Sequence, residues 1–598
     1  MNTLKRRTFL SLISQACAAT ACLPFIDHTK ALSQTYSNSV SQTTCWLDVC
    51  APLVIQDREL GIDSELVLTS DNFIGAKGYA DNLDVTEYEI YLYDTDGKPV
   101  GTDGVAKRLV VPAMHTTVIP VTDLTGSSPF WGGMRVRLKP KTRTPTHASD
   151  LFSSAFVRWR TNNSFAKVHA NPDPLEWQRA DSFFYSMPFP PLNQYDCFYS
   201  VFNPYAEKST GAVTLYDHFG AKLAEIPYDL KPHSSVLIDL HRAELADNIR
   251  DVLNESRSHH VQKIQGTNGG TVAVTNRSGS VKNFGYLFIK QNNSKRFTIE
   301  HPIHQPPYNP LPASTPFDAA GRMKAKNILY TPLVFEQKSI GGITFQSRFH
   351  LSSGAPMEET LWLNPFITDE RGEVVWQMGP ATKPPPSIPE KQIERGSIKL
   401  GGQQSCIIDC SQLGLPRNFS GGLSLAITPL SNHTLMKVEL NVVEWNAPAF
   451  THFRPGLASA RAYQKPAHRT GLATDYITTG ARLDENGAKM LRDEVIGVMN
   501  IDDKTIAGNP TLEVFSTNGL VTRVKLGAVP PFSCRHYLLS DLLSEKIGPR
   551  DLSLRLIDEQ ATLLMSIVHV DFERHDIAAD HGSDRFSTFT EYTCGVKA

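Results

Sequence analysis

The sequence lacks the short motifs that mark the commonest classes of enzyme. It contains no P-loop, no GxGxxG after a predicted strand, no HExxH and no GxSxG. It also has no CxxC pair of the kind that holds zinc, an iron–sulfur cluster or haem. The sequence therefore predicts no cofactor. Hydrolases whose carboxylates come from distant strands stay compatible with it, because a pair of Asp or Glu residues needs no fixed spacing.

The chain also lacks an excess of positive charge and, after its first 31 residues, a long apolar run. It has 59 Lys and Arg against 61 Asp and Glu, and residues 32–598 keep 55 against 60, a formal charge of −5. This balance predicts no nucleic-acid partner. Because residues 32–598 contain no run of 18 apolar residues, we expect no transmembrane segment in the mature chain.

Cysteine is scarce, with nine residues in 598. Seven lie beyond residue 31, and an odd count leaves at least one unpaired in a monomer. An oxidising compartment would permit Cys45 to pair with Cys50, or Cys406 with Cys410, but positions four apart on one strand are too distant for easy bridging. We expect most of the seven to be small buried residues, namely Cys45, Cys50, Cys197, Cys406, Cys410, Cys534 and Cys594.

The first 31 residues have the order of a secretory signal, with basic residues, then an apolar stretch, then small and polar residues. The string Arg6-Arg7-Thr8-Phe9-Leu10 resembles the twin-arginine (Tat) signal, so Arg6, Arg7, Phe9 and Leu10 are the predicted export residues. The resemblance implies transport of an already folded protein to a periplasmic, cell-surface or extracellular location. An ordinary secretory signal or an organelle-targeting peptide is the alternative. Lipid anchoring at Cys22 stays open, although cleavage near Ala31 is preferred.

One succession of signals recurs four times along the mature chain. Each pass has an alternating strand, a turn with Gly, another strand, an apolar run ending near Asp, and a long final strand. We expect the recurring acids to end a strand or cap a short helix, and we predict a helix after the second of them, in HRAELADNIRDVLNE. The turn glycines are Gly97, Gly220, Gly372 and Gly519, and the marker acids are Asp123, Asp239, Asp409 and Asp541.

This repetition predicts an all-β fold, a tandem array of about four immunoglobulin-like β-sandwich modules with few short helices. The predicted organisation is a signal peptide at 1–31 and modules at 44–170, 183–302, 321–452 and 491–598. Segments rich in Pro, Gly or small polar residues separate the modules, near 170–182, 302–320 and 453–490.

Two phrases, YLYDTDGKPVG and VTLYDHFGAKLAE, resemble bacterial surface β-sandwich modules of the FxLYD or CARDB (cell-adhesion-related) kind. The resemblance covers about 40 residues in each of the first two modules, and Pro365 and Phe515-Ser516 depart from it in the third and fourth. It implies an immunoglobulin-like architecture and an adhesive or scaffolding role. It supplies no catalytic residues.

Several polar clusters are candidate metal sites. Asp94-Thr95-Asp96-Gly97 has too few acids for a calcium loop and is interpreted as a turn. His301 and His304 lie in a proline-rich stretch interpreted as a linker, and a polar C-terminal cluster is interpreted as a solvated tail. That cluster contains His575, Asp576, Asp580, His581 and Asp584. Metal binding is left unknown. A histidine also follows the final strand of each module, at His169, His301, His452 and His581, for which the sequence gives no physical reason.

Phe130 and Trp131, beside two glycines, are the candidate platform for a ligand, since glycan binding needs an exposed aromatic surface. The alternative is that both rings plug the end of a sandwich. A protein or a glycan is the partner the sequence permits, and oligomeric state is not predicted.

These patterns lead to three hypotheses about function. The leading one is an exported, non-catalytic binding, adhesion or scaffolding protein of the periplasm or cell surface, because repetition occurs without site motifs. The second is an exported hydrolase of glycans or lipids with its site at a module interface. The third is a metal- or cofactor-carrying periplasmic protein.

Overall fold

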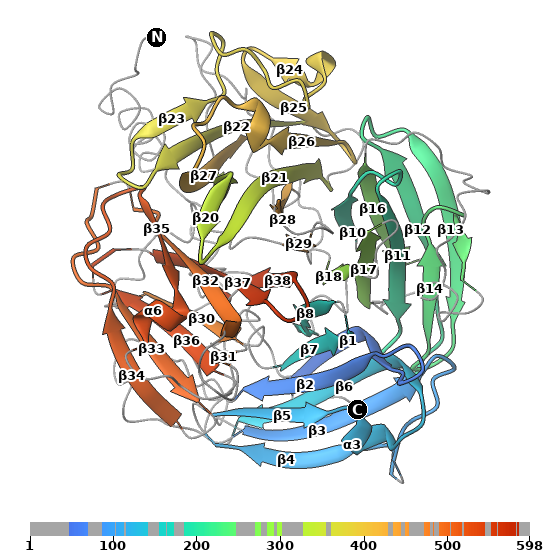
Figure 1. The fold of residues 1–598 in the computed structure, drawn as a ribbon. Helices are drawn as coiled ribbons and strands as arrows, with labels where there is room; N and C mark the ends of the chain where they lie inside the picture. Colours follow the sequence, from blue (N-terminus) through green and yellow to red (C-terminus); the bar gives the residue numbers. More distant parts are fainter. Residues whose placement is uncertain are drawn as a thin grey trace, which may run out of the picture.

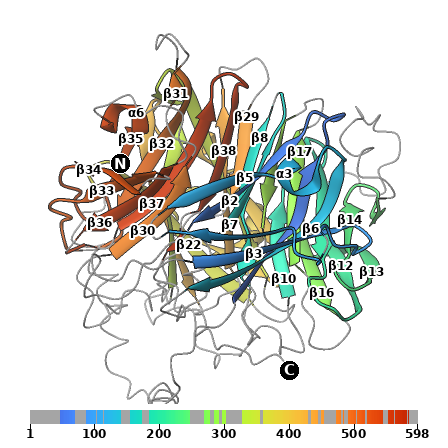
Figure 2. The ribbon, with the colours of Figure 1, turned by 90° about the horizontal axis from the view of Figure 1, so that it is seen from below.

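The computed structural model shows an all-β protein in which antiparallel sheets are arranged around a common centre (Figure 1). Figure 2 shows the same arrangement from the side. The described residues are 47–69, 86–101, 103–112, 115–140, 155–162, 164–172, 184–246, 269–276, 284–291, 296–301, 327–354, 360–428, 434–443, 449–453, 472–478, 482–483, 490–502, 504–516, 519–543, 552–558, 560–561, 563–581 and 583–584. These residues form eight sheets, two from each of four consecutive segments of the chain.

The first segment, residues 47–172, forms sheets with the orders β4-β3-β6-β1-β9 and β5-β2-β7-β8. A single helical turn, α3, follows β5. The bounds are β1 Leu47–Gln56, β2 Asp63–Thr69, β3 Thr86–Asp94, β4 Lys107–Val111, β5 Thr116–Pro120, α3 Thr122–Thr125, β6 Phe130–Pro140, β7 Ala155–Arg160, β8 Phe165–His169 and β9 Asn171–Pro172.

The second segment, residues 184–300, forms sheets with the orders β10-β16-β12-β13 and β15-β14-β11-β17-β18. The bounds are β10 Phe184–Phe189, β11 Tyr195–Phe202, β12 Ser209–Asp217, β13 Lys222–Leu230, β14 Ser235–Asp239, β15 Glu244–Leu245, β16 Gly270–Asn276, β17 Phe284–Gln291 and β18 Phe297–Glu300.

The third segment, residues 327–453, forms the sheet β19-β27-β22-β25-β24, with β23 beside β22, and the sheet β20-β21-β28-β29, with β26 beside β21. The bounds are β19 Asn327–Glu336, β20 Lys338–Ile340, β21 Ile343–Ser353, β22 Thr360–Asp369, β23 Val374–Gln377, η2 Glu390–Gln392, β24 Ile393–Glu394, β25 Ser397–Gly401, β26 Ser405–Asp409, η3 Cys410–Gln412, β27 Phe419–Thr428, β28 Thr434–Val442 and β29 Ala449–Phe453.

The fourth segment, residues 472–584, forms the sheet β34-β33-β36-β30-β39 and the sheet β31-β32-β37-β38, with β35 beside β32. The bounds are β30 Leu472–Thr478, β31 Arg482–Leu483, β32 Met490–Asn500, β33 Thr511–Ser516, β34 Gly519–Lys525, β35 Cys534–Leu538, α6 Leu539–Leu542, β36 Leu552–Asp558, β37 Leu563–Asp571, β38 Asp576–His581 and β39 Ser583–Asp584.

The four segments share one strand order. In the first, β1, β6, β3 and β4 are neighbours in one sheet, and β5, β2, β7 and β8 are neighbours in the other. The strands β10, β16, β12 and β13 repeat the first set in the second segment, and β14, β11, β17 and β18 repeat the second set. The third and fourth segments follow the same scheme. The recurrence predicted from the sequence therefore corresponds to a recurring topology.

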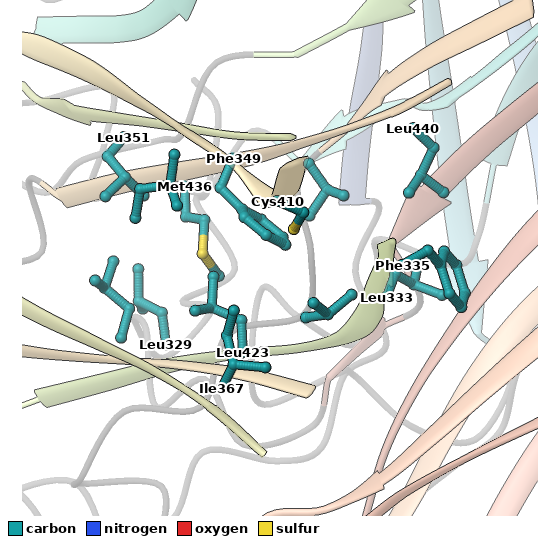
Figure 3. Close-up of a cluster of buried hydrophobic side chains, with 14 of the residues drawn as sticks. Leu329, Leu333, Phe335, Phe349, Leu351, Ile367, Cys410, Leu423, Met436 and Leu440 are labelled. Atoms are coloured by element: carbon teal, nitrogen blue, oxygen red, sulfur yellow. The ribbon is translucent and has the colours of Figure 1, made fainter. Parts of the chain in front are cut away.

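Apolar side chains fill the space between the two sheets of a segment. Figure 3 shows this core in the third segment, where Leu329 and Leu423 face Leu351 and Met436 across the gap. Each such side chain contributes about 1.5–3 kcal/mol when fully buried. The core is not confined to one segment, because the same cluster includes Val495 and Val568 of the fourth. A second cluster likewise joins the first and second segments.

Hairpin turns join neighbouring segments. The turn between β3 and β4 lies against residues 232–234, the turn between β12 and β13 against 402–404, and the turn between β22 and β23 against 531–533. In each case the receiving residues stand directly before β14, β26 or β35. Backbone N–H groups of Ser235 and Ser405 donate to the carbonyls of Thr95 and His218, at 3.1 and 3.2 Å. Three of the four predicted turn glycines, Gly97, Gly220 and Gly372, thus lie at junctions.

The receiving loops share an unusual backbone conformation. His233, Gln403 and Phe532 occupy equivalent places and have φ values of 59°, 61° and 54°, in the left-handed region that non-glycine residues rarely adopt. The same strained turn thus recurs at three junctions. The fourth turn, residues 517 and 518, lies outside the described part of the chain.

The structure corrects two expectations about the marker acids. Residues 241–246 after Asp239 form a turn and the short strand β15, not the start of the predicted helix. Asp239 and Asp409 do accept hydrogen bonds from following backbone N–H groups, those of His241 and Ser411. Asp123 and Asp541 lie inside the short helices α3 and α6 and are exposed, so the four acids do not occupy one equivalent position.

We predict that Gly372→Ala destabilises the protein more than Gly414→Ala. Both glycines have positive φ, 82° and 69°, and the strained backbone alone costs an alanine roughly 1–2 kcal/mol. A Cβ on Gly372 would also collide with the carbonyl oxygen of Pro531, whereas a Cβ on Gly414 would meet no atom within 4 Å. Melting temperatures of the two variants check this. Equal losses would show that the turn does not depend on close docking.

Candidate functional site

Four short strands meet at the centre of the molecule, which we call the hub: β8, β18, β29 and β38 (Figure 1). Strand β8 contacts β18 and β38, and β29 contacts the same two strands. Each pairs with the long preceding strand of its own segment. The four recurring histidines lie at or beside the ends of these strands. His169 and His581 are the last residues of β8 and β38, His301 directly follows β18, and His452 is the second-to-last residue of β29. Their recurrence therefore marks hub positions rather than linkers.

His169 and His301 meet across the hub. Both are fully buried, and their ring centroids are 4.1 Å apart in an edge-to-face arrangement. The hydroxyl of Tyr286 donates to the carbonyl of His169 at 2.8 Å, which joins the first two segments. His301 was expected in an extended linker, and this expectation is wrong, because the residue directly follows a hub strand.

A buried ion pair joins the second and third segments at the hub. Lys437 Nζ lies 2.5 Å from Glu300 Oε1 and donates to the carbonyl oxygen of His301 at 2.9 Å. The lysine side chain is fully buried and the glutamate side chain is 2% exposed. Because a charge this deep is costly without a partner, removing either residue alone costs about 3–5 kcal/mol.

A second buried carboxylate, Glu439, lies in the same junction. His350 Nε2 is 2.7 Å from its Oε2, Arg348 Nη1 is 3.4 Å from its Oε1, and Tyr195 of the second segment donates to it at 3.3 Å. Burial alone would raise the pKa of Glu439. The hydrogen bond from His350 and the charges of His350 and Arg348 outweigh burial and hold this pKa well below its usual range.

A third cluster joins the first and fourth segments. Lys167 Nζ is 3.4 Å from His569 Nε2, and His569 Nδ1 is 2.5 Å from Glu494 Oε2. All three residues are buried. Burial, together with the charge of Lys167, lowers the pKa of His569, although Glu494 opposes this effect. A neutral His569 between a lysine and a carboxylate can accept from one and donate to the other.

Asp576 of the fourth segment closes the ring by binding Phe165 and Ser164 of the first, which stand 411 and 412 positions earlier in the chain. Its Oδ2 accepts from the backbone N–H of Phe165 and from Ser164 Oγ, both at 2.8 Å. Ser164 Oγ also accepts from the N–H of Phe297 at 3.0 Å, so this hydroxyl of the first segment contacts both the second and the fourth. Burial raises the pKa of Asp576 to about 7, against these hydrogen bonds. The expected solvated tail is therefore wrong here, since Asp576 is 1% exposed in a hub strand.

A polar cleft of about 370 Å³ opens beside this closure. Its walls come from β2, from the ends of β5 and β7, and from the turn between β37 and β38. Arg574 in that turn donates through Nε to the carbonyl of Thr161 at 2.8 Å, which holds the two segments together. The lining residues are Gln56, Arg58, Gly61, Asp63, Ser64, Glu65, Pro120, Thr122, Arg160, Thr161, Asn162 and Arg574.

The predicted ligand platform is not formed as an exposed surface. Phe130 is 5% exposed and belongs to the core of the first segment. Trp131 is partly buried against the same core, with its indole N–H 3.4 Å from Asp57 Oδ2. The alternative, in which both rings pack into the sandwich, describes their position.

The other predicted sites have simpler outcomes. Asp94 closes a turn, accepting from the N–H groups of Asp96 and Lys98 at 3.0 and 2.8 Å. Cys406 and Cys410 are buried free thiols, and no disulfide joins them. The export residues Arg6, Arg7, Phe9 and Leu10, and also Cys22 and His304, lie outside the described residues. Within the described part of the chain, no group of three or more His, Cys, Asp or Glu residues is arranged to hold a metal ion.

No family model and no curated protein matches the chain. Among the helices that the structure describes, none has both the length and the apolar character needed to cross a membrane. The recurring histidines were the one sequence pattern that pointed to the hub, and no pattern pointed to the cleft. The charged residues of both come from strands far apart in the chain.

We predict that Asp576→Asn stabilises the protein at pH 8 relative to the wild type, with the difference shrinking towards pH 5. The folded pKa, about 7, exceeds the ordinary value of 3.8, so the stability that protonated Asp576 gives is lost as pH rises towards 7. The loss is at most about 1.4 kcal/mol per pH unit. Melting temperatures across this range test it, with Asp96→Asn as an exposed control. A pH-independent difference would contradict it.

Proposed function

We propose that this chain is an exported, non-catalytic binding or scaffolding protein of the periplasm or cell surface. In this proposal the twin-arginine signal, residues 1–31, directs export, and the mature protein presents a rigid ring of β-sandwich modules to a protein or glycan partner. The observation that carries it is the interlocking of the four segments, since buried polar contacts join the second segment to the third at Glu300 and Lys437, and the first to the fourth at Ser164 and Asp576.

The ring also gives a physical reason for the export of a folded chain. Closure brings Ser164 against Asp576, and pairing across such distances is slow, because the entropy of closing long loops is lost before the contacts form. A chain that folds slowly through non-local contacts is exposed to aggregation outside the cytoplasm. Twin-arginine transport after folding avoids this problem.

We further propose that each segment is a permuted immunoglobulin-like module. In an immunoglobulin domain, strand F lies between C and G, and strand B lies between A and E. Here β6 lies between β3 and β1, and β2 lies between β7 and β5. The first strand thus takes the place of G, and the seventh takes the place of A. The adhesive role suggested by the FxLYD and CARDB resemblance belongs to the same proposal.

Replacing Arg6 and Arg7 together by Lys is expected to abolish export, because twin-arginine transport depends on the arginine pair. Cell fractionation followed by immunoblotting would show the precursor retained in the cytoplasm. Lys5→Arg keeps the pair and serves as the control. Secretion of the double variant at the control level would refute the export route.

An exported hydrolase is the second candidate, favoured by the presence of Asp63 and Glu65 in an inter-segment cleft. The two residues stand two apart on β2, so their side chains leave the strand on the same face. Glycosidases use such a pair of carboxylates, one as acid and one as base or nucleophile. Glu65, however, lies 2.9 Å from Arg158 Nη2 and 3.3 Å from Arg160 Nη1, which favours a structural role.

Incubation of the mature protein with neutral glycans separates the two candidates. Under the leading proposal no reducing ends are released, and Asp63→Asn behaves as the wild type. Release that Asp63→Asn abolishes would instead establish the hydrolase. Reducing-end assays and chromatography of the products provide the measurement.

A further inference from the structure

Three hairpin turns border the polar cleft beside the ring closure, and each brings one guanidinium group to its lining. Arg58 lies in the turn between β1 and β2, Arg160 ends β7, and Arg574 lies in the turn between β37 and β38. Guanidinium groups present planar forks of N–H donors that match the oxygens of a carboxylate or a phosphate. The lining therefore combines three groups suited to an oxyanion.

The half-buried carboxylate of the lining, Glu65, is outweighed by two cations. It lies 2.9 Å from Arg158 Nη2 and 3.3 Å from Arg160 Nη1. The Arg158 side chain is 1% exposed, so its guanidinium group adds a positive charge behind the lining, where salt screens it little. This side of the cleft therefore keeps a positive charge although it contains a carboxylate.

The turn between β37 and β38 has the same composition. Asp571 lies 2.7 Å from Arg574 Nη1 and 3.4 Å from Arg492 Nε, so a single carboxylate again contacts two guanidinium groups. Arg574 Nε also donates to the carbonyl of Thr161 at 2.8 Å. These contacts fix the position of Arg574, which therefore loses little conformational entropy when a ligand binds.

Two exposed charges of opposite sign complete the lining, those of Arg58 and Asp63. Among the residues that the structure describes, none forms an ion pair with Arg58. The turn that carries Arg58 is held by Asp57, a buried carboxylate that accepts from the N–H groups of Glu59 and Leu60 at 3.1 and 3.3 Å. Arg58 is thus the cation that is open to a ligand, and Asp63 is the acid that opposes an anion.

The arginines outnumber the acids around this cavity. When the lining residues are counted with the charged residues bound to them, five guanidinium groups stand against three carboxylates, which leaves two positive charges at neutral pH. An excess of one sign in a cleft raises the local concentration of ligands of the opposite sign. The groups counted are those of Arg58, Arg158, Arg160, Arg492 and Arg574 and, on the acidic side, Asp63, Glu65 and Asp571.

We propose that the cleft binds a small dianion whose charged groups are carboxylates or a phosphate. Two negative charges match the two positive ones, and the side chains of Asn162 and Thr122 supply further donors to the oxygens of the ligand. The volume of the cavity, about 370 Å³, lies at the lower end of small-molecule sites, which span about 300–1,000 Å³. The site adds a ligand to the chain and does not depend on the proposed scaffolding role.

Calorimetric titration of the mature protein with succinate and with inorganic phosphate tests the proposal, at low ionic strength and at a pH where both carry two negative charges. Acetate, with one charge, and succinamide, with none, are the reference probes. We expect at least one dianion to bind with a Kd of about 1 mM or tighter and about tenfold more tightly than acetate. Adding about 0.3 M NaCl weakens this binding by about threefold or more, because salt screens the attraction between exposed charges.

Two variants of exposed lining residues test the sign of the charge that the cleft selects. Arg58→Gln weakens binding of the dianion by about tenfold, because it removes an open guanidinium group. Asp63→Asn tightens the binding by about threefold or more, because it removes an opposing charge. The asparagine keeps an oxygen that accepts from Gln56, as Asp63 Oδ1 does at 3.0 Å. Melting temperatures of both variants check that the fold is kept.

Matched controls are Arg417→Gln and Asp96→Asn, exposed residues of the same types that do not line the cleft. Unchanged affinity in these two, with opposite changes in the two cleft variants, supports the site, and the dianion that binds more tightly identifies the oxyanion. The proposal is overturned if neither dianion binds, if acetate or succinamide binds as tightly, or if Asp63→Asn weakens binding. None of these failures affects the proposed export and scaffolding role.

Discussion

The structure depends on one repeated contact, the docking of a hairpin turn of one segment on the loop that precedes β14, β26 or β35 of the next. At Gly97, Gly220 and Gly372 the backbone of one segment approaches the backbone of another so closely that a Cβ atom would collide. The receiving loop meets this approach with a left-handed residue that is not glycine, as at Phe532. Such strain persists only when surrounding contacts hold it. The turn and the loop therefore stabilise each other, and together they fix the angle between neighbouring segments.

Because the same docking recurs from segment to segment, the four sheets that contain β8, β18, β29 and β38 come together at the hub. Buried polar side chains there meet partners from a neighbouring segment. Lys437 lies against Glu300, Tyr195 donates to Glu439, and Lys167 Nζ lies 3.4 Å from His569 Nε2. Each of these contacts joins two different segments. Buried pairs of this kind add little net stability but strongly disfavour any arrangement that separates them. They select one register of the four segments.

The cleft has the same origin. It exists because the turns after β7 and β37 meet at the closure, where Arg574 holds Thr161 and Asp576 holds Ser164. Its lining comes from the first segment apart from Arg574 of the fourth, so no contiguous stretch of sequence contains this polar concave surface.

The sequence by itself determined the strands, the turns and the recurrence. Alternation of apolar and polar residues marks strands such as β3, whose side chains alternate between buried and partly exposed, and Asp94 beside Gly97 marks a turn because local hydrogen bonds suffice to form it. Local signals failed where a tertiary contact decides the outcome. Where a helix was expected to begin, residues 241–246 form a turn and the pairing of β15 with β14. Asp576, polar and near the C-terminus, is buried against Ser164 and Phe165 of the first segment. The recurring histidines were visible as a pattern, but only the ring brings His169 of the first segment against His301 of the second, because no single segment contains both.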